Sequence, residues 1–185
     1  MMRVLVIYAT RLGSTGEIAR HLAQRLAHSD IEADPIGVDD PDLAIALPDR
    51  DGYVIGSAIY AGHWLAPAVE LVRRYQTSLA SRPVWLFSSG PVGETAVSHE
   101  PADPKELARM WAAVRPRDHR VFAGALDRGT LADADLGRVE RFVAERFVPE
   151  GDYRDWPAID AWADDIARAL GAAGSIALAG RSTVA

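Results

Sequence analysis

Cysteine and asparagine are absent from this chain of 185 residues, and lysine occurs once, at Lys105. A chain without cysteine forms no disulfide, no thiolate nucleophile, no iron–sulfur cluster and no thiolate zinc site. Its chemistry must therefore come from hydroxyls, carboxylates, histidines or a cofactor, and we expect no bound metal. No apolar run approaches the roughly 18 residues that span a bilayer, so we expect no transmembrane segment.

Acidic residues outnumber basic residues by 26 to 20, so the net charge is −6. This balance argues against nucleic acid as a partner, since phosphate binding needs a basic face. An acidic surface is compatible with solubility alone and with the docking of a basic redox protein. The N-terminal apolar stretch has about five residues and no small-residue cleavage site, so it predicts a strand rather than a signal peptide, and a cytoplasmic location.

Short apolar runs alternate with helical patterns along the chain. Strands are predicted at residues 3–8, 31–38, 52–57, 83–88 and 119–125. Helices are predicted at residues 17–28, 64–79, 103–114, 135–148 and 156–170. Such alternation indicates the α/β class, with a parallel sheet and right-handed crossovers. We expect a single domain over residues 1–170 and a flexible tail over residues 171–185.

The stretch YATRLGSTGEIA, residues 8–19, joins the first strand to the first helix and is rich in hydroxyls and glycine. In sheets of this kind, ligands bind at the carboxyl ends of the strands. Ser14 and Glu17 have the spacing of a capping box, which predicts a helix start at this point. The free N–H groups of such a start attract anions, and hydroxyls from Thr10, Ser14 and Thr15 could add donors.

The kind of anion is restricted by what this loop lacks. It has no Gly-Lys-Ser/Thr sequence for a nucleotide P-loop and no G-x-G-x-x-G fingerprint for a dinucleotide. Hydroxyls with one guanidinium suit a single terminal phosphate. An ordinary capped turn between a strand and a helix explains the same residues, and the loop alone leaves the two interpretations open.

Two further loops are predicted at the same edge of the sheet. GSAIYAGHW, residues 56–64, follows the third strand, and SSGPVG, residues 88–93, follows the fourth. The first offers aromatic side chains beside glycine, and the second offers serines and backbone donors. A planar heterocycle could lie between them with its phosphate in the first loop. Taken singly, each segment is equally consistent with an aromatic pair or a Gly-Pro turn of purely structural value.

The order of these motifs resembles the menaquinone-dependent protoporphyrinogen oxidase family, whose fold is that of flavodoxin. Thr10, Arg11, Gly13 and Thr15 follow that family's S/T-R-x-G-x-T pattern, and VIGSAIYAGHW, residues 54–64, follows its V-I-G-x-x-I-x-x-G-H-aromatic run. FAGAL, residues 122–126, resembles its fifth strand, and YRDW, residues 153–156, resembles the approach to its last helix. The similarity extends over roughly residues 3–170.

This resemblance implies a flavodoxin-like three-layer sandwich, with five parallel strands in the order 2-1-3-4-5 and helices on both faces. It also implies FMN as the cofactor and a two-electron oxidation with a quinone or another small molecule as acceptor. The residues implied to bind FMN are Thr10, Arg11, Leu12, Gly13, Ser14 and Thr15 at the phosphate, and Ala58, Ile59, Tyr60, Ala61, Gly62, Ser88, Ser89, Gly90, Pro91, Val92 and Gly93 at the ring.

His63 is the candidate catalytic residue, as a proton relay, because histidine titrates near neutral pH. A histidine that only closes the loop by hydrogen bonding is an equally good interpretation. The family has a basic, apolar segment after the fifth strand, whereas residues 127–151 here balance arginine with glutamate. We therefore expect this segment to pack on the domain rather than on a membrane. The family's tyrosine before Gly-His is replaced here by Ala61, and both departures argue against a porphyrinogen as substrate.

Two other functions remain open from the sequence. A flavodoxin in the strict sense would carry electrons between proteins and would dock them through the acidic surface. A protein that kept the fold without the flavin would act by binding partners. Turnover of a small substrate with a quinone alone would separate an enzyme from a carrier, and failure to bind FMN would support the binding protein.

Overall fold

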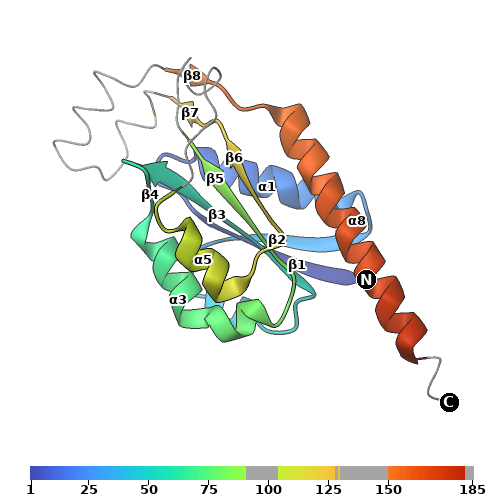
Figure 1. Cartoon of the computed structure of the whole chain (residues 1–185). Coiled ribbons are helices and arrows are strands. Elements are labelled where there is room, and N and C mark those ends of the chain that lie inside the picture. The colour runs from blue at the N-terminus through green and yellow to red at the C-terminus, as the bar shows by residue number, and fades with distance from the viewer. Residues whose placement is uncertain (91–103, 128, 130–149, 182–185) are drawn as a thin grey trace.

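The computed structural model describes residues 1–90, 104–127, 129 and 150–181, with side chains as far as residue 172. Its centre is a parallel sheet of β1 (Met2–Ala9), β2 (Ile31–Gly37), β3 (Gly52–Tyr60), β5 (Val84–Ser89) and β6 (Asp118–Phe122). These strands lie side by side in the order β2-β1-β3-β5-β6 (Figure 1). Counted along the chain this is 2-1-3-4-5, so the predicted order is confirmed.

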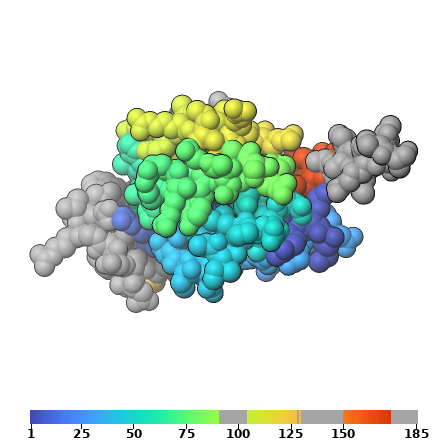
Figure 2. Space-filling model, turned by 90° about the horizontal axis from the view of Figure 1, so that it is seen from below, coloured from blue at the N-terminus to red at the C-terminus, as the bar shows by residue number. Residues whose placement is uncertain are grey.

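Both faces of the sheet are covered, which explains why its central strands are almost continuously apolar. On one face, α1 (Ser14–Ala27) and α8 (Trp156–Arg181) pack with residues such as Val4 and Val54. On the other, α3 (Ala66–Ala80) and α5 (Leu107–Val114) pack with residues such as Leu5 and Ile55, and the short α2 (Leu43–Ala46) joins them. Figure 2 shows this second face, with α3 in green beside α5 in yellow.

Two short antiparallel pairs lie at the edge where the strands of the sheet end, one joined to β3 and the other a separate two-stranded sheet. β4 (His63–Trp64) folds back on the end of β3, and β7 (Ala125–Leu126) pairs with β8 (Gly151–Asp152) beyond β6. Both pairs lie at the same end of the molecule as the start of α1 (Figure 1). This end therefore holds the loops that the sequence singled out.

Some boundaries differ from the prediction for identifiable reasons. β3 runs to Tyr60, three residues past its predicted end, because the hairpin to β4 prolongs its pairing. The fifth predicted strand stops at Phe122, and Ala125 and Leu126 pair with β8 instead. α8 continues to Arg181, so the predicted helix end at Leu170 was wrong. The predicted helix at 135–148 lies outside the described residues.

Within the described part of the chain, no helix is both long enough and apolar enough to cross a membrane. The same residues include no group of three or more histidines, aspartates and glutamates arranged to hold a metal ion. The division into a domain over residues 1–170 and a flexible tail over 171–185 stays a prediction.

Candidate functional site

The loops after β1, β3 and β5 lie next to one another because the register of the sheet aligns the ends of these strands. Ala9 pairs with Ser57, and Ala58 pairs with Ser89. Strand β1 therefore ends beside the start of the hairpin, and the hairpin lies beside the turn that follows β5. Three segments that are far apart in the sequence form a single edge, where a sheet of this topology binds its ligands.

At the end of the loop after β1, the first backbone N–H groups of α1 have no carbonyl acceptor within the helix. Gly13 has φ = 89°, and its N–H donates to Oγ1 of Thr10 at 3.0 Å. The first hydrogen bond of α1 runs from the Glu17 N–H to the Gly13 carbonyl, so the N–H groups of the three preceding residues have no partner in the helix. No atom lies within 4 Å of a Cβ placed on Gly13. The donor set and the open backbone both fit a phosphate.

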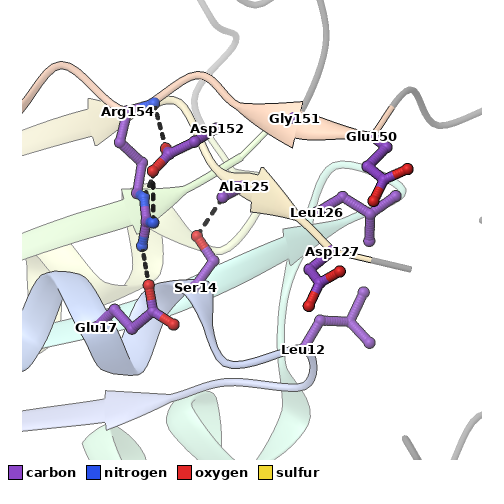
Figure 3. A pocket seen from close by; sticks show the side chains of 10 residues that line it. All are labelled: Leu12, Ser14, Glu17, Ala125, Leu126, Asp127, Glu150, Gly151, Asp152 and Arg154. Carbon is purple, nitrogen blue, oxygen red and sulfur yellow. Dashed lines mark hydrogen bonds and ion pairs between the residues drawn. The ribbon is translucent and has the colours of Figure 1, made fainter. Parts of the chain in front are cut away.

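The capping box predicted for Ser14 and Glu17 does not form. Oγ of Ser14 accepts a hydrogen bond from the N–H of Ala125 at 3.0 Å, and Glu17 binds Nη1 of Arg154 at 2.5 Å (Figure 3). Tertiary partners have thus taken both groups that would have capped the helix. Oγ of Ser14 ties the start of α1 to β7, and its hydroxyl hydrogen remains available for an acceptor.

Arg154 is the residue of this region that sequence reasoning missed. Its side chain is only 8% exposed, stacks on Trp156 at 4.5 Å and binds Asp152 as well as Glu17. The hydrogen bonds from Arg154 lower the pKa of Asp152 below its ordinary value. The YRDW motif drew attention to the segment, but no local pattern indicates a contact with a residue 137 positions earlier.

A hollow of about 330 Å³ lies on the side of α1 that faces β7 and β8 (Figure 3). Its lining residues are Leu12, Ser14, Glu17, Ala125, Leu126, Asp127, Glu150, Gly151, Asp152 and Arg154. Four of these are carboxylates and one is a cation. An acidic wall of this kind disfavours an anion, so the phosphate-like donor set of the loop belongs to the open side of Gly13 and not to this hollow.

The segment from Ala58 to Gly62 is the end of β3 and the tip of its hairpin. Tyr60 pairs with His63, and the two residues between them have positive φ, 51° at Ala61 and 79° at Gly62. Two consecutive left-handed residues make the tight turn whose twist matches that of paired strands. The guanidinium of Arg11 lies over the ring of Tyr60, at 5.4 Å from its centre. The first loop and the hairpin are therefore in direct contact.

His63 is joined to the residues that precede α5. Its Nδ1 lies 2.6 Å from Oε1 of Glu106, and its Nε2 lies 3.1 Å from Nζ of Lys105. The other carboxylate oxygen of Glu106 accepts the Trp64 N–H at 3.1 Å. Partial burial acts to raise the pKa of Glu106, but these hydrogen bonds outweigh it and hold that pKa below its ordinary value. Sequence reasoning named His63 and missed both of its partners.

The end of β5 is hydrogen-bonded to the hairpin through Ser88. Oγ of Ser88 is fully buried, accepts from Nε1 of Trp64 at 2.8 Å and meets Nε2 of His119 at 2.9 Å. Gly90 has φ = 120°, and its N–H donates to the carbonyl of Phe122. The hydroxyl of Ser88 is therefore used inside the protein, whereas Ser89 and Gly90 lie at the edge itself. Pro91, Val92 and Gly93 lie outside the described residues.

Comparison with known proteins identifies the family to which this fold belongs. The model of the family described as "Flavodoxin domain" matches residues 5–142. A protein named protoporphyrinogen IX dehydrogenase [quinone] from Escherichia coli (strain K12) is 32% identical over 130 residues, which cover 68% of this chain and 70% of the relative. A Leishmania major protein of the same name is 27% identical over 179 residues, 89% of this chain and 74% of the relative.

Solved structures share the fold at low identity. A flavodoxin from the domain Archaea has a TM-score of 0.57 and 15% identity, and the match covers 92% of this chain and 99% of the other. Rubredoxin oxygen:oxidoreductase from Desulfovibrio gigas has a TM-score of 0.60 and 17% identity, with 92% of this chain covered and 36% of the other. These likenesses establish the fold of the chain.

Proposed function

We propose a specific reaction for this chain, which belongs to the flavodoxin-domain family and is a flavoprotein oxidoreductase with FMN as its cofactor. The chain passes electrons from a reduced small-molecule substrate through FMN to a quinone-type acceptor. The relatives are named for the dehydrogenation of protoporphyrinogen IX with a quinone. A porphyrinogen is therefore the first substrate class to test, in spite of the departures noted in the sequence. The 32% identity of the Escherichia coli relative supports this class.

The single observation that carries the proposal is the alignment of three loops at the carboxyl edge of the sheet. In this proposal the backbone N–H groups at the start of α1, with the hydroxyls of Thr10, Ser14 and Thr15, hold the phosphate of FMN. Residues 58–62, with Ser89 and Gly90, line its ring. Arg11, stacked on Tyr60, joins the two parts of the site.

FMN supplies the redox chemistry when bound, and the protein positions it and tunes its environment. The chain's own residues bind the phosphate, orient the ring and exclude water from one side of it. The hairpin is well suited to this role, because Trp64 of β4 donates hydrogen bonds to Ser88 and Glu106, and the Leu65 N–H joins the end of β4 to Ser57 of β3. A rigid wall keeps the geometry of the site constant while the substrate and the acceptor exchange.

The net charge of −6 favours a second candidate, a carrier that docks basic redox proteins through an acidic surface. One assay distinguishes the two functions. An enzyme of the proposed kind reduces a soluble quinone with a small reductant and no other protein. A carrier becomes reduced only when a reductase protein is present.

The cofactor site is tested by the affinity for FMN, measured by quenching of flavin fluorescence in titrations of the purified protein. The double variant Ser14→Ala/Thr15→Ala removes two hydrogen bonds to a charged group and should weaken binding by on the order of 2 kcal/mol or more, about 30-fold. Thr77→Ala, on the exposed face of α3, is the matched control and should bind as the wild type does. Unchanged affinity in the double variant would remove the phosphate assignment.

A further inference from the structure

The side chain of His63 has a defined hydrogen-bonding arrangement, although it is 47% exposed. Nε2 meets the ammonium of Lys105 at 3.1 Å, and an ammonium can only donate. Nε2 must therefore be the acceptor, which puts the ring hydrogen on Nδ1. That nitrogen donates to Oε1 of Glu106 at 2.6 Å. The other ring nitrogen, Nε2, therefore faces away from the carboxylate.

Glu106 is itself held in place. Its second oxygen accepts the N–H of Trp64, whose indole is 3% exposed and donates to the buried hydroxyl of Ser88. The hydrogen bonds that lower the pKa of Glu106 keep it a carboxylate at neutral pH. A carboxylate on one imidazole nitrogen fixes both the tautomer and the orientation of the ring, and it stabilises the imidazolium when the other nitrogen takes a proton.

Tethering of the hairpin does not require this histidine. The bond from the Trp64 N–H to Glu106 and the bond from the Lys105 N–H to the Gly62 carbonyl already join the two segments. The imidazole adds a basic nitrogen at an exposed position, one residue from the hairpin tip that the proposed function places along the FMN ring. In the described part of the chain, the charged groups in contact with His63 are Glu106 and Lys105.

We propose that Glu106 is a positioning residue that holds His63 with its hydrogen on Nδ1, so that Nε2 accepts the proton released by a reduced substrate as its electrons pass to FMN. This inference rests on the proposed function. Lys105 donates to the same nitrogen in the substrate-free protein. Its exposed, flexible side chain yields that position to the substrate.

The step balances for the first two-electron oxidation of a porphyrinogen, in which one meso C–H bond and one pyrrole N–H bond break and two electrons and two protons are lost. FMN, when bound, would supply the acceptor for the two electrons and for the hydrogen of the C–H bond. The second proton leaves a pyrrole nitrogen, whose N–H bond breaks as a new N–H bond forms at Nε2 of His63. The resulting imidazolium keeps its hydrogen bond from Nδ1 to Glu106 and afterwards returns the proton to solvent.

The first test uses the FMN-free protein and nitrogen-15 NMR of its histidines. At a pH at which the ring is neutral, the spectrum should show the hydrogen of His63 on Nδ1. In Glu106→Gln/Lys105→Met the amide still accepts from the Trp64 N–H but can turn its NH₂ group toward Nδ1, and no ammonium donates to Nε2, so the ring hydrogen should move to Nε2. Lys105→Met alone should leave it on Nδ1. A wild-type His63 with its hydrogen on Nε2, or an unchanged tautomer in Glu106→Gln/Lys105→Met, overturns the inference.

The second test is anaerobic stopped-flow reduction of the FMN-loaded protein by protoporphyrinogen IX, followed by flavin absorbance across pH. Glu106→Gln should slow reduction about 100-fold and move the acid limb of the rate–pH profile to lower pH, because a neutral amide no longer stabilises the imidazolium. FMN affinity should not change. The control is Glu70→Gln, which alters an exposed carboxylate on α3 paired with Arg73 and should leave the rate and the profile unchanged.

His63→Ala should lose at least as much rate and regain part of it when imidazole is added, a recovery that a purely structural histidine would not show. If Glu106→Gln keeps the wild-type rate and pH profile, the inference fails and the proposed function stands. If protoporphyrinogen IX does not reduce FMN in the wild type, the porphyrinogen assignment and this inference fail together.

Discussion

The substitution Gly56→Ala should be strongly destabilising, because the motif glycine lies beneath a buried aromatic ring. Gly56 pairs with Phe87 on the neighbouring strand. A Cβ at Gly56 would lie 2.0 Å from Cζ, 2.1 Å from Cε1 and 2.5 Å from Cε2 of that ring. Real Cβ atoms essentially never approach other atoms closer than 3.0 Å, so either the ring or the strand must move.

The ring has little room to withdraw. Phe87 is fully buried, and its centre lies 6.2 Å from the ring of Phe122 and 6.2 Å from the ring of Trp162. Overpacking of a core costs about 1–3 kcal/mol, and a displaced ring held between two other rings belongs at the upper end, about 3 kcal/mol. For a chain of this size, that loss corresponds to a decrease in Tm of about 6–12 °C.

Urea unfolding followed by tryptophan fluorescence measures the loss, and a double-mutant cycle assigns its cause. Phe87→Leu makes room for the added methyl group, so Gly56→Ala/Phe87→Leu should be more stable than the sum of the two single effects by about 2 kcal/mol. Gly171→Ala is the matched control: it adds a methyl group in a helix with no atom within 4 Å and should gain about 0.5–1 kcal/mol. A loss below about 1 kcal/mol in Gly56→Ala, or strict additivity in the cycle, would refute the reasoning.

Two further predictions concern the edge that carries the site. Arg154→Met should cost about 1–2 kcal/mol in urea unfolding at pH 7, less than for a fully buried ion pair, because the carboxylates it releases are half exposed and regain water. The pKa of Asp152 is lowered in the folded state, so its contribution is complete above the ordinary aspartate pKa and is lost as pH falls below about 4. The difference between Arg154→Met and the wild type should therefore shrink at pH 3, and a constant difference would contradict this coupling. Ala61→Gly should raise stability by about 0.5–1 kcal/mol, because Ala61 has φ = 51° and glycine removes the cost of that conformation; a lower Tm in calorimetry would count against it.

The order of the sheet and the place of its loops could be predicted because they follow from local patterns and general rules of chain topology. Apolar runs alternating with helical periodicity indicate a parallel sheet, and parallel strands bring their carboxyl ends to one edge. The capping-box spacing indicated a helix start in the segment 14–17, and α1 begins at Ser14, but the predicted capping contacts do not form. Ala125 and Arg154 lie more than 100 positions away and bind the groups that local spacing assigned to the cap.

The sequence pattern by itself determined the fold and the edge of the sheet that carries the site. It also identified the hydroxyl-rich loop as a candidate anion site and His63 as a candidate catalytic residue. Only the tertiary structure decided what these residues contact. In the structure, His63 is hydrogen-bonded to Glu106, 43 positions away. The hydroxyl of Ser88 is bonded to Trp64 in the interior, and Gly56 lies against the ring of Phe87 on the neighbouring strand. The reason is physical: periodicity records which face of an element is buried, whereas a hydrogen bond or a steric contact depends on where two distant segments meet.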